Sequence, residues 1–262
     1  MVQLSPEQQV AKIYSALFRA WGRQHWWPAQ SRFEVIVGAY LTQNTSWSNV
    51  EIAMGNLRST RVLNLPGIRR IPLRKLEQLI RSSGYFRQKA ARLKLFVKFL
   101  DENYSGSLTR MFAQSTAKLR EELLALNGVG PETADSILLY AGQHPIFVVD
   151  AYTRRIAARH GIVLEKASYD EIRTLFERSL AIHGSAESES ETAAKFELRR
   201  DAQCLGKPKG TSHIASRMSV ANRAPLAQVF NEMHGLIVGV GKNYCSKSQP
   251  KCEQCPLQHL LP

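Results

Sequence analysis

The feature that most constrains the fold of this chain is the spacing of its apolar residues, which recur every three or four positions along most of the sequence. That spacing gathers them on one face of an α-helix, whereas a half-buried strand would alternate apolar and polar residues. One short β-branched run, 145–149, is either a strand or a buried loop. The sequence therefore predicts an all-α protein, with helices over residues 6–21, 33–41, 50–57, 73–82, 88–100, 116–126, 133–140, 151–160, 169–182 and 226–239.

The composition limits the partners that such a protein could have. Lys and Arg total 35 against 22 Asp and Glu, and the net charge of +13 favours a polyanion, most often nucleic acid, over an inert basic surface. No apolar run is long enough to cross a bilayer, and the N-terminal stretch MVQLSPEQQVAKIYSALFRA lacks the pattern of a signal peptide. We therefore expect an intracellular, cytoplasmic protein without a membrane partner.

One segment differs from the rest of the chain. Residues 184–224 are rich in Ser, Ala, Glu, Lys and Arg and poor in large apolar residues, and an acidic patch, SAESESET, is followed by a basic one. This composition predicts an inserted, partly mobile segment. Alternatively, residues 191–201 form a short helix that packs on the body of the protein.

The strongest local motif is a glycine-rich turn, LNGVGPETA at residues 126–134, between two helical patterns. Gly128 and Gly130 allow a tight turn, and the helix that follows directs the positive end of its dipole to the same place. Such a turn either binds a phosphate through its backbone N–H groups or simply joins two helices. Further along, Asp150 ends an apolar run and opens the next helical pattern, a position that also suits a helix N-cap.

The stretch LNGVGPETADSILLYAGQHPIFVVDAYTRRIAARHG resembles the helix-hairpin-helix and Gly/Pro…Asp signature of the endonuclease III superfamily of DNA glycosylases. Other stretches resemble the family in the same order: VIVGAYLTQNTSWSNVEIAMGNL, IRSSGYFRQKAARL and HGLIVGVGKNYCSKSQPKCEQCPL. The resemblance implies two α-helical domains with a DNA-binding cleft between them. Residues 31–144 would form a six-helix barrel domain with the hairpin, and residues 1–30 with 145–262 would form the second domain.

The resemblance also implies a mechanism. Family members that cut the DNA strand carry a lysine two residues after the second hairpin glycine, where it forms a Schiff base with the sugar. Glu132 stands there in this chain, and a carboxylate cannot form an imine. The chain therefore looks like a monofunctional DNA N-glycosylase without efficient lyase activity. Asp150 matches the family's catalytic aspartate, which would stabilise the oxocarbenium-like sugar and orient or deprotonate the attacking water.

Aromatic residues suggest the substrate. Trp26, Trp27 and Pro28, together with Trp47 after QNT, resemble the 3-methyladenine branch of the superfamily, in which these positions form a stacking pocket for the flipped base. We place Glu132 in the same pocket. Alkylated purines such as 3-methyladenine and 7-methylguanine are cationic, so an electron-rich aromatic pocket attracts them. Packing in the protein core is the alternative role for these tryptophans.

The resemblance assigns a further set of residues to DNA. Gln43 matches the glutamine that probes the duplex or fills the gap left by the flipped nucleotide, although a helix-capping or buried amide is the alternative. The remaining predicted contacts are Asn44, Gly128, Val129, Gly130, Thr133 and Lys89. Lys89 belongs to a basic stretch, residues 69–98, in which some cations would contact phosphates and others would form a solvated helix face.

The cysteines predict a metal site that lacks one ligand. The spacing of Cys245, Cys252 and Cys255 resembles the first three ligands of the family's [4Fe–4S] loop, but Leu261 stands where the fourth cysteine is expected. Cys204 or His259 could supply the fourth ligand. A zinc site with the same ligands and a metal-free loop are the alternatives.

Together these features predict a monomeric base excision repair enzyme that binds double-stranded DNA and hydrolyses the N-glycosidic bond of an alkylated purine. Two alternatives stay open. The substrate could be an oxidised pyrimidine, uracil or a mispaired base, or the chain could be a non-catalytic DNA-binding protein of the same fold.

Overall fold

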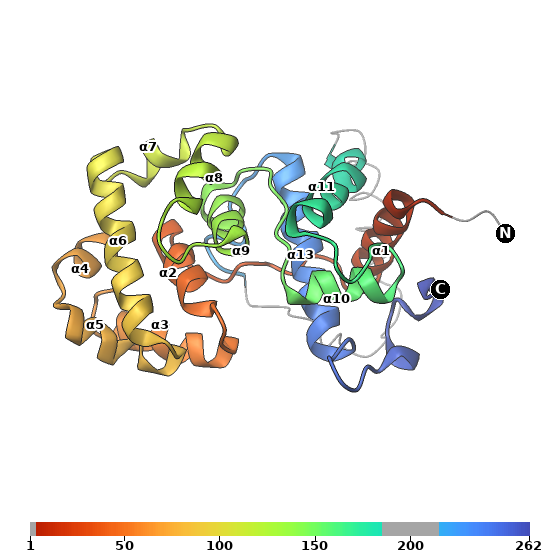
Figure 1. Ribbon diagram of the computed structural model, residues 1–262, viewed down its shortest axis with the longest axis horizontal. Helices are drawn as coiled ribbons and strands as arrows, with labels where there is room; N and C mark the ends of the chain where they lie inside the picture. Colours follow the sequence, from red (N-terminus) through yellow and green to blue (C-terminus); the bar gives the residue numbers. More distant parts are fainter. Residues whose placement is uncertain (1–3, 185–214) are drawn as a thin grey trace. The chain divides into compact units, whose positions relative to one another are not determined.

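The computed structural model describes residues 4–184 and 215–262 (Figure 1). These residues form helices and loops and contain no strand, which confirms the all-α prediction for the described part of the chain. The proposed short helix at 191–201 and Cys204 lie outside the described residues. Among the helices that are described, none is both long enough and apolar enough to cross a membrane.

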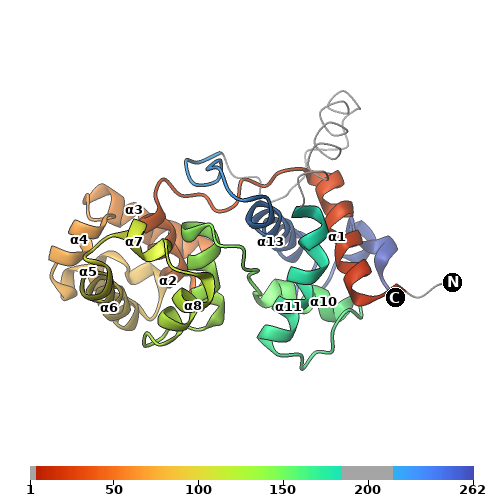
Figure 2. The ribbon, with the colours of Figure 1, turned by 90° about the horizontal axis from the view of Figure 1, so that it is seen from above.

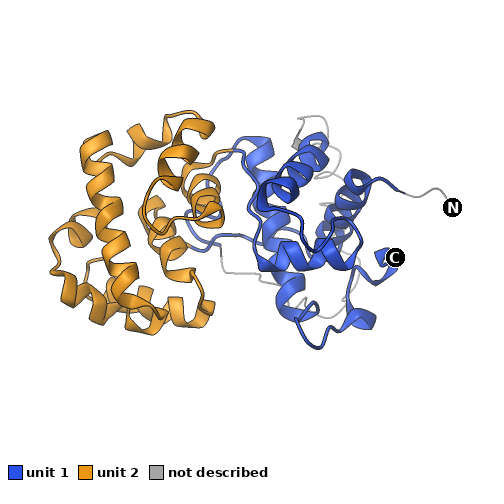
Figure 3. Ribbon diagram, viewed as in Figure 1, with its two compact units in different colours: residues 1–28, 145–262 blue, residues 29–144 orange. Residues whose placement is uncertain are grey.

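The chain divides into two compact units (Figure 3). Unit 2 is one continuous stretch, residues 29–144, and unit 1 combines residues 1–28 with 145–262. The first helix of the sequence therefore shares a unit with the last one.

Unit 2 is built around α2 (Arg32–Thr42), in which every residue from Phe33 to Leu41 is buried. A helix that is buried on all sides needs partners on all sides, and α2 contacts α3, α6, α9 and η2. The other helices of this unit are α3 (Trp47–Ser59), α4 (Leu65–Arg70), α5 (Leu73–Leu79), η1 (Arg81–Ser83), α6 (Phe86–Tyr104), α7 (Leu108–Phe112), α8 (Thr116–Leu124), α9 (Pro131–Ser136) and the π-helical η2 (Ile137–Gly142).

Unit 1 is built around α13 (Pro225–Asn243), in which every residue from Val229 to Gly241 is buried. It contacts α1, α10, α11 and η3, and Figure 2 shows α1, α11 and α13 side by side. The other elements are α1 (Pro6–Trp21), α10 (Ala151–Arg159), α11 (Tyr169–Leu180), η3 (Ala181–Gly184), η4 (Cys252–Gln254) and η5 (Gln258–Leu260).

The 145–149 run is not a strand, and its residues 146–149 are buried, while Pro145 is exposed. Its Phe147 ring stacks on Phe176 of α11 with centroids 4.8 Å apart and meets Phe230 of α13 edge-on at 5.9 Å. The run is apolar because it passes through the core of unit 1, and it ends directly at Asp150.

Candidate functional site

The glycine-rich turn joins α8 to α9 as the hairpin motif predicts. Gly128 has φ +78°, a left-handed conformation that favours glycine, and Gly130 is the N-cap of α9 with Pro131 behind it. Val129 is buried, while Gly130 and Glu132 are exposed. The turn is therefore anchored by Val129, and its residues at the start of α9 are exposed to solvent.

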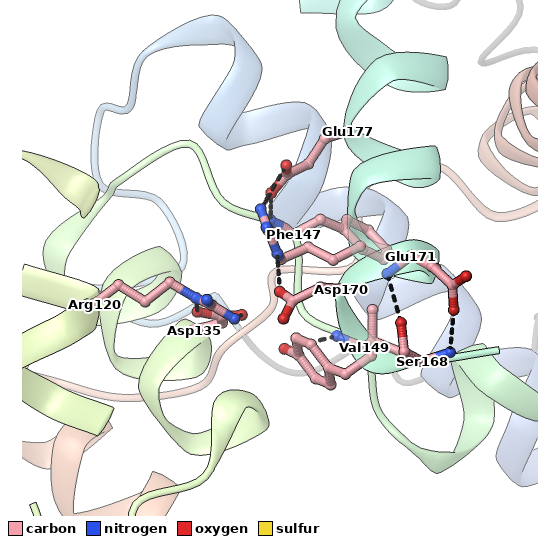
Figure 4. A network of polar contacts seen from close by, with 10 residues as sticks. Arg120, Asp135, Phe147, Val149, Ser168, Asp170, Glu171 and Glu177 are labelled. Atoms are coloured by element: carbon pink, nitrogen blue, oxygen red, sulfur yellow. Dashed lines mark hydrogen bonds and ion pairs between the residues drawn. The ribbon is translucent and has the colours of Figure 1, made fainter. Parts of the chain in front are cut away.

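A buried ion pair holds the two hairpin helices together. Arg120 of α8 donates from Nε to Oδ1 of Asp135 on α9 at 2.8 Å, and Asp135 is fully buried (Figure 4). The second nitrogen, Nη2, reaches the other carboxylate oxygen at 3.3 Å. Because a buried carboxylate without its cation is costly, this pair fixes the hairpin angle.

Gln43 ends α2 and is anchored on the hairpin. Its Nε2 donates to the carbonyl of Gly128 at 3.0 Å and to Oγ1 of Thr133 at 2.9 Å. Arg92 of α6 donates from Nη1 to its Oε1 at 2.9 Å. The structure thus brings together Gln43, Gly128 and Thr133, which the sequence assigns to DNA. It adds Arg92, which the sequence showed only as one of several cations in the basic stretch 69–98.

Lys89 does not lie where the sequence analysis placed it. Its side chain is 1% exposed, and Nζ donates to the carbonyls of Leu41 at 2.9 Å and Ser83 at 2.6 Å. Burial lowers the pKa of Lys89 to about 8, and the nearby Arg92 cation adds to the shift. The assignment of Lys89 to DNA is therefore wrong for this structure, because its ammonium group is buried and joins the end of α2 to η1.

Several other predicted residues of unit 2 lie at its surface or close to it. Asn44 is exposed with φ +52°, and Trp47 is half-buried at the first position of α3. In the basic stretch, Nη2 of Arg69 forms an ion pair with Oδ1 of Asp101 at 2.6 Å, so this cation has a structural partner within unit 2.

Tyr85 is a residue that the sequence analysis missed. It precedes α6 in a left-handed conformation, φ +44°, and its side chain is 65% exposed. A bulky residue in this conformation is strained, and such strain gathers at functional positions. Its neighbours Arg81 and Arg87 both lie against the Phe86 ring, at 5.9 and 5.8 Å from the centroid. No sequence pattern predicts the left-handed conformation of Tyr85. The only signal in the sequence is an aromatic residue directly after Gly84.

In unit 1, Asp150 is the N-cap of α10. Its Oδ1 accepts the backbone N–H of Thr153 at 2.7 Å and the Thr153 hydroxyl at 2.8 Å. The other oxygen, Oδ2, lies 3.7 Å from Nε2 of His234 on α13. The N-cap alternative is therefore present, but it uses one oxygen, and the second is directed elsewhere.

The segment before Asp150 is fixed by α11 (Figure 4). The N–H of Phe147 donates to Oε1 of Glu177 at 3.0 Å, and the N–H of Val149 donates to the hydroxyl of Tyr169 at 3.3 Å. Arg173 in turn holds Glu177 through Nη1 at 2.8 Å. These bonds set the position of the Asp150 backbone independently of its own side chain.

His234 faces a mostly apolar environment. It is buried, and its ring lies 6.1 Å from the Trp26 ring and 6.3 Å from the Phe147 ring, centroid to centroid. Burial lowers the pKa of His234, and the Asp150 carboxylate opposes this shift only in part. A neutral imidazole thus lies between the candidate catalytic carboxylate and the tryptophan segment.

The tryptophan segment is held by α13. Trp26 and Trp27 are 5% and 6% exposed, with their rings edge-on at 5.5 Å, and Pro28 ends the segment. The N–H of Gln24 donates to Oε2 of Glu232 at 3.0 Å. Burial raises the pKa of Glu232. Both tryptophans are therefore largely buried in unit 1, and a small part of each side chain stays exposed.

The three C-terminal cysteines gather at one cavity. Cys245, Cys252 and Cys255 line it, and Leu261 lines it too. Arg159 of α10 donates from Nη1 to Cys245 Sγ at 3.1 Å and to the carbonyl of Ser246 at 2.7 Å.

Burial raises the pKa of the Cys255 thiol, and the neighbouring thiols add to this shift. Across residues 4–184 and 215–262, no group of three or more His, Cys, Asp or Glu side chains has the geometry to hold a metal ion. The donor set present thus fits a [4Fe–4S] cluster or zinc only in part, and His259 is not among the residues that line the cavity.

Comparisons with known proteins identify relatives of this chain. The chain is 40% identical to a protein of Methanocaldococcus jannaschii named "Putative DNA repair glycosylase", over 97% of this chain and 96% of the relative. The structure resembles the H. pylori 3-methyladenine DNA glycosylase MagIII bound to 1,N6-ethenoadenine, with a TM-score of 0.65 and 27% identity over 91% of this chain and 98% of that one.

A trapped endonuclease III–DNA complex shares the fold, with a TM-score of 0.68 and 21% identity over 100% of this chain and 96% of that chain. Residues 37–181, more than half of the chain, match the HhH-GPD superfamily of base excision DNA repair proteins. The helical fold, the hairpin, Asp150 and these matches lead to one conclusion: the chain belongs to the HhH-GPD superfamily and is a base excision repair DNA glycosylase.

Proposed function

We propose that this glycosylase hydrolyses the N-glycosidic bond of alkylated purines, such as 3-methyladenine or 7-methylguanine, in duplex DNA. The observation that carries the proposal is the grouping in unit 1, where Trp26 and Asp150 both approach His234. The likeness to a 3-methyladenine DNA glycosylase, at 27% identity, supports the same substrate class. An alkylated purine is cationic, so it stacks well on aromatic rings and leaves without a general acid.

The reaction proceeds by hydrolysis. Asp150 stabilises the positive charge that develops on the sugar as the bond between C1′ and the purine nitrogen breaks. Water attacks C1′, and its proton passes to the carboxylate. Oδ2 of Asp150 is the oxygen for this work, because Oδ1 is held by Thr153. The product is an abasic site, and Glu132 in place of a lysine leaves the strand uncut.

We assign base contacts to Trp26, Trp27, Pro28, Trp47 and Glu132, and DNA contacts to Gln43, Asn44, Gly128, Val129, Gly130 and Thr133. The two compact units are the two domains in this proposal, and the protein acts as a monomer on genomic DNA within the cell. Contacts to backbone phosphates release counterions, so the affinity for DNA should fall as the salt concentration rises. The rate of base release at limiting enzyme should fall with it.

The cysteine loop has a structural role in this proposal. Bound to Cys245, Cys252 and Cys255, a [4Fe–4S] cluster would hold the C-terminal loop against α10 and would supply no step of the hydrolysis. Arg155 and Arg159 already attach this loop through the carbonyls of Cys245 and Ser246.

The test is base release from duplexes that carry 3-methyladenine or 7-methylguanine, with Asp150→Asn compared to the native protein. The native protein should free the base and leave sites that break only on alkali treatment. Asp150→Asn should release it at least 100-fold more slowly while binding the duplex. Glu165→Gln, which removes an exposed carboxylate of unit 1, is the control.

Two outcomes would overturn the proposal. Release of an oxidised pyrimidine, uracil or a mispaired base in place of the alkylated purine would move the chain to another substrate class. Duplex binding without release from any defined lesion would make it a non-catalytic member of the family.

A further inference from the structure

Arg92 contacts both parts of the proposed DNA-contacting surface of unit 2, which are Gln43 and the hairpin turn at 128–133. It lies on α6 and is half-buried, and its Nη1 donates to Oε1 of Gln43 at 2.9 Å. Gln43 in turn donates to Gly128 and Thr133 of the hairpin. One guanidinium group therefore reaches the hairpin through the glutamine at the end of α2.

The hydrogen bonds define one orientation of the Gln43 amide. An amide offers two N–H donors and one carbonyl acceptor, and here Nε2 donates twice while Oε1 accepts from a cation. Turning the amide over would place its NH₂ against the guanidinium of Arg92 and its oxygen against the carbonyl of Gly128. Both contacts would be repulsive, so Arg92 selects the orientation that the hairpin can bind.

Arg92 also touches the hairpin directly. A Cβ atom added to Gly128 would overlap the guanidinium, with Nη2 of Arg92 2.6 Å away. The space that a side chain would need at this turn is therefore filled by Arg92. Lysine could carry the charge, but its single ammonium group would not fill this space or donate from a planar fork.

We propose that Arg92 is a positioning residue, which locks Gln43 to the hairpin so that the glutamine and the turn meet DNA as one preformed surface. This inference rests on the proposed function for its biological meaning. A surface that is already ordered loses less entropy on binding than one that must order on contact. Arg92 thus acts through Gln43, and its charge need not contact a phosphate.

The test is a double-mutant cycle of Arg92→Gln and Gln43→Ala. The probe is a duplex with a tetrahydrofuran abasic-site analogue, and binding is measured across a series of salt concentrations. Arg92→Gln alone should weaken binding about tenfold, the effect of losing one charge-assisted hydrogen bond. In the Gln43→Ala background the same change should cost less than about threefold, because its partner is already gone. Arg92→Lys should recover only part of the loss.

A charge-matched control separates positioning from simple attraction. Arg110→Gln removes one exposed cation of α7 in the same unit. If Arg92 acts through Gln43, the salt slope of Arg92→Gln should match that of the native protein. A slope reduced by about one, together with additive losses in the cycle, would make Arg92 a phosphate contact and overturn the inference.

A second readout does not depend on DNA. The side-chain amide resonances of Gln43 should shift in Arg92→Gln, and the backbone amides of residues 128–130, 132 and 133 should exchange faster with solvent, while Arg110→Gln should change neither. Unchanged Gln43 resonances would overturn the inference. If the native protein binds the abasic duplex no better than intact duplex, the proposed function fails, and this readout alone then decides the role of Arg92.

Discussion

In the proposed reaction, one oxygen of Asp150 has a structural role and the other takes part in the chemistry. Oδ1 caps α10, and Oδ2 lies near a buried neutral imidazole. A carboxylate whose backbone is held by α11 and whose one oxygen is held by Thr153 has little freedom to rotate. The remaining oxygen is therefore set in place before any substrate arrives, as positioned catalytic groups require.

His234 offers a test of that arrangement at the scale of a residue. His234→Phe keeps an aromatic ring between Trp26 and Phe147 but removes the nitrogen that lies 3.7 Å from Oδ2. We expect base release to slow about tenfold because Asp150 loses a polar neighbour. Single-turnover release at neutral pH measures the effect. An unchanged rate, with an unchanged melting temperature, would show that His234 only fills space.

Lys89 should matter for stability and not for DNA. Lys89→Met leaves the carbonyls of Leu41 and Ser83 without their buried donor, and we expect the free energy of unfolding to fall by about 2 kcal/mol. Denaturant titration measures this loss. Lys98→Met, at an exposed position of the same helix, is the stability control. A lower salt slope for DNA binding in Lys89→Met would restore the original assignment of Lys89 to DNA.

At the scale of elements, the hairpin depends on one glycine more than on the other. Gly128 combines a left-handed φ with Arg92 in the space beside it, whereas Gly130 has φ −93° and open space around its Cα. We expect Gly128→Ala to lower the free energy of unfolding by about 2 kcal/mol and Gly130→Ala to change it little. Equal effects of the two variants would contradict this account of the turn.

The C-terminal loop makes a prediction about iron. Leu261 lines the same cavity as the three cysteine side chains. Leu261→Cys should therefore raise the iron and sulfide content of protein purified without oxygen, because it restores the fourth thiolate of the family pattern. Metal analysis and the visible absorption spectrum measure this. The same iron content in both proteins would mean that the native loop already completes its ligand set or cannot hold a cluster at all.

The sequence predicted the long helices well because a helix of several turns repeats its apolar spacing often enough to be read. The prediction for 6–21 agrees with α1, while α4 and α7 were missed because six and five residues hold too few repeats. In the candidate site, Gln43 and Gly128 were predicted and do meet. Arg92 was not singled out, since its partner Gln43 is 49 positions away and only the fold brings them together.

At the scale of the whole molecule, three buried histidines contribute to the dependence of stability on pH. Burial lowers the pKa values of His144, His160 and His234 below the usual 6.5. The unfolded chain then binds more protons than the folded one below about pH 6.5. The stability that these groups provide is fully present above that pH and is lost as the pH falls through their folded pKa values.

We therefore expect the melting temperature to be lower at pH 5.5 than at pH 7.5. Thermal unfolding followed by circular dichroism at both values checks this. The decrease should be smaller in His144→Gln, since one of the three titrating groups is then absent. A melting temperature that stays constant over this range would contradict the burial of these side chains.

Unit 1 combines two segments that are far apart in the sequence, and this affects when its helices can pack during synthesis. The α1 helix leaves the ribosome well before its partners α11 and α13, which begin only at Tyr169 and Pro225. At the usual speed of translation, its apolar face stays without both partners for roughly 10–40 s, while the continuous stretch 29–144 is already complete. The apolar face of α1 thus stays uncovered during synthesis until both α11 and α13 have been made.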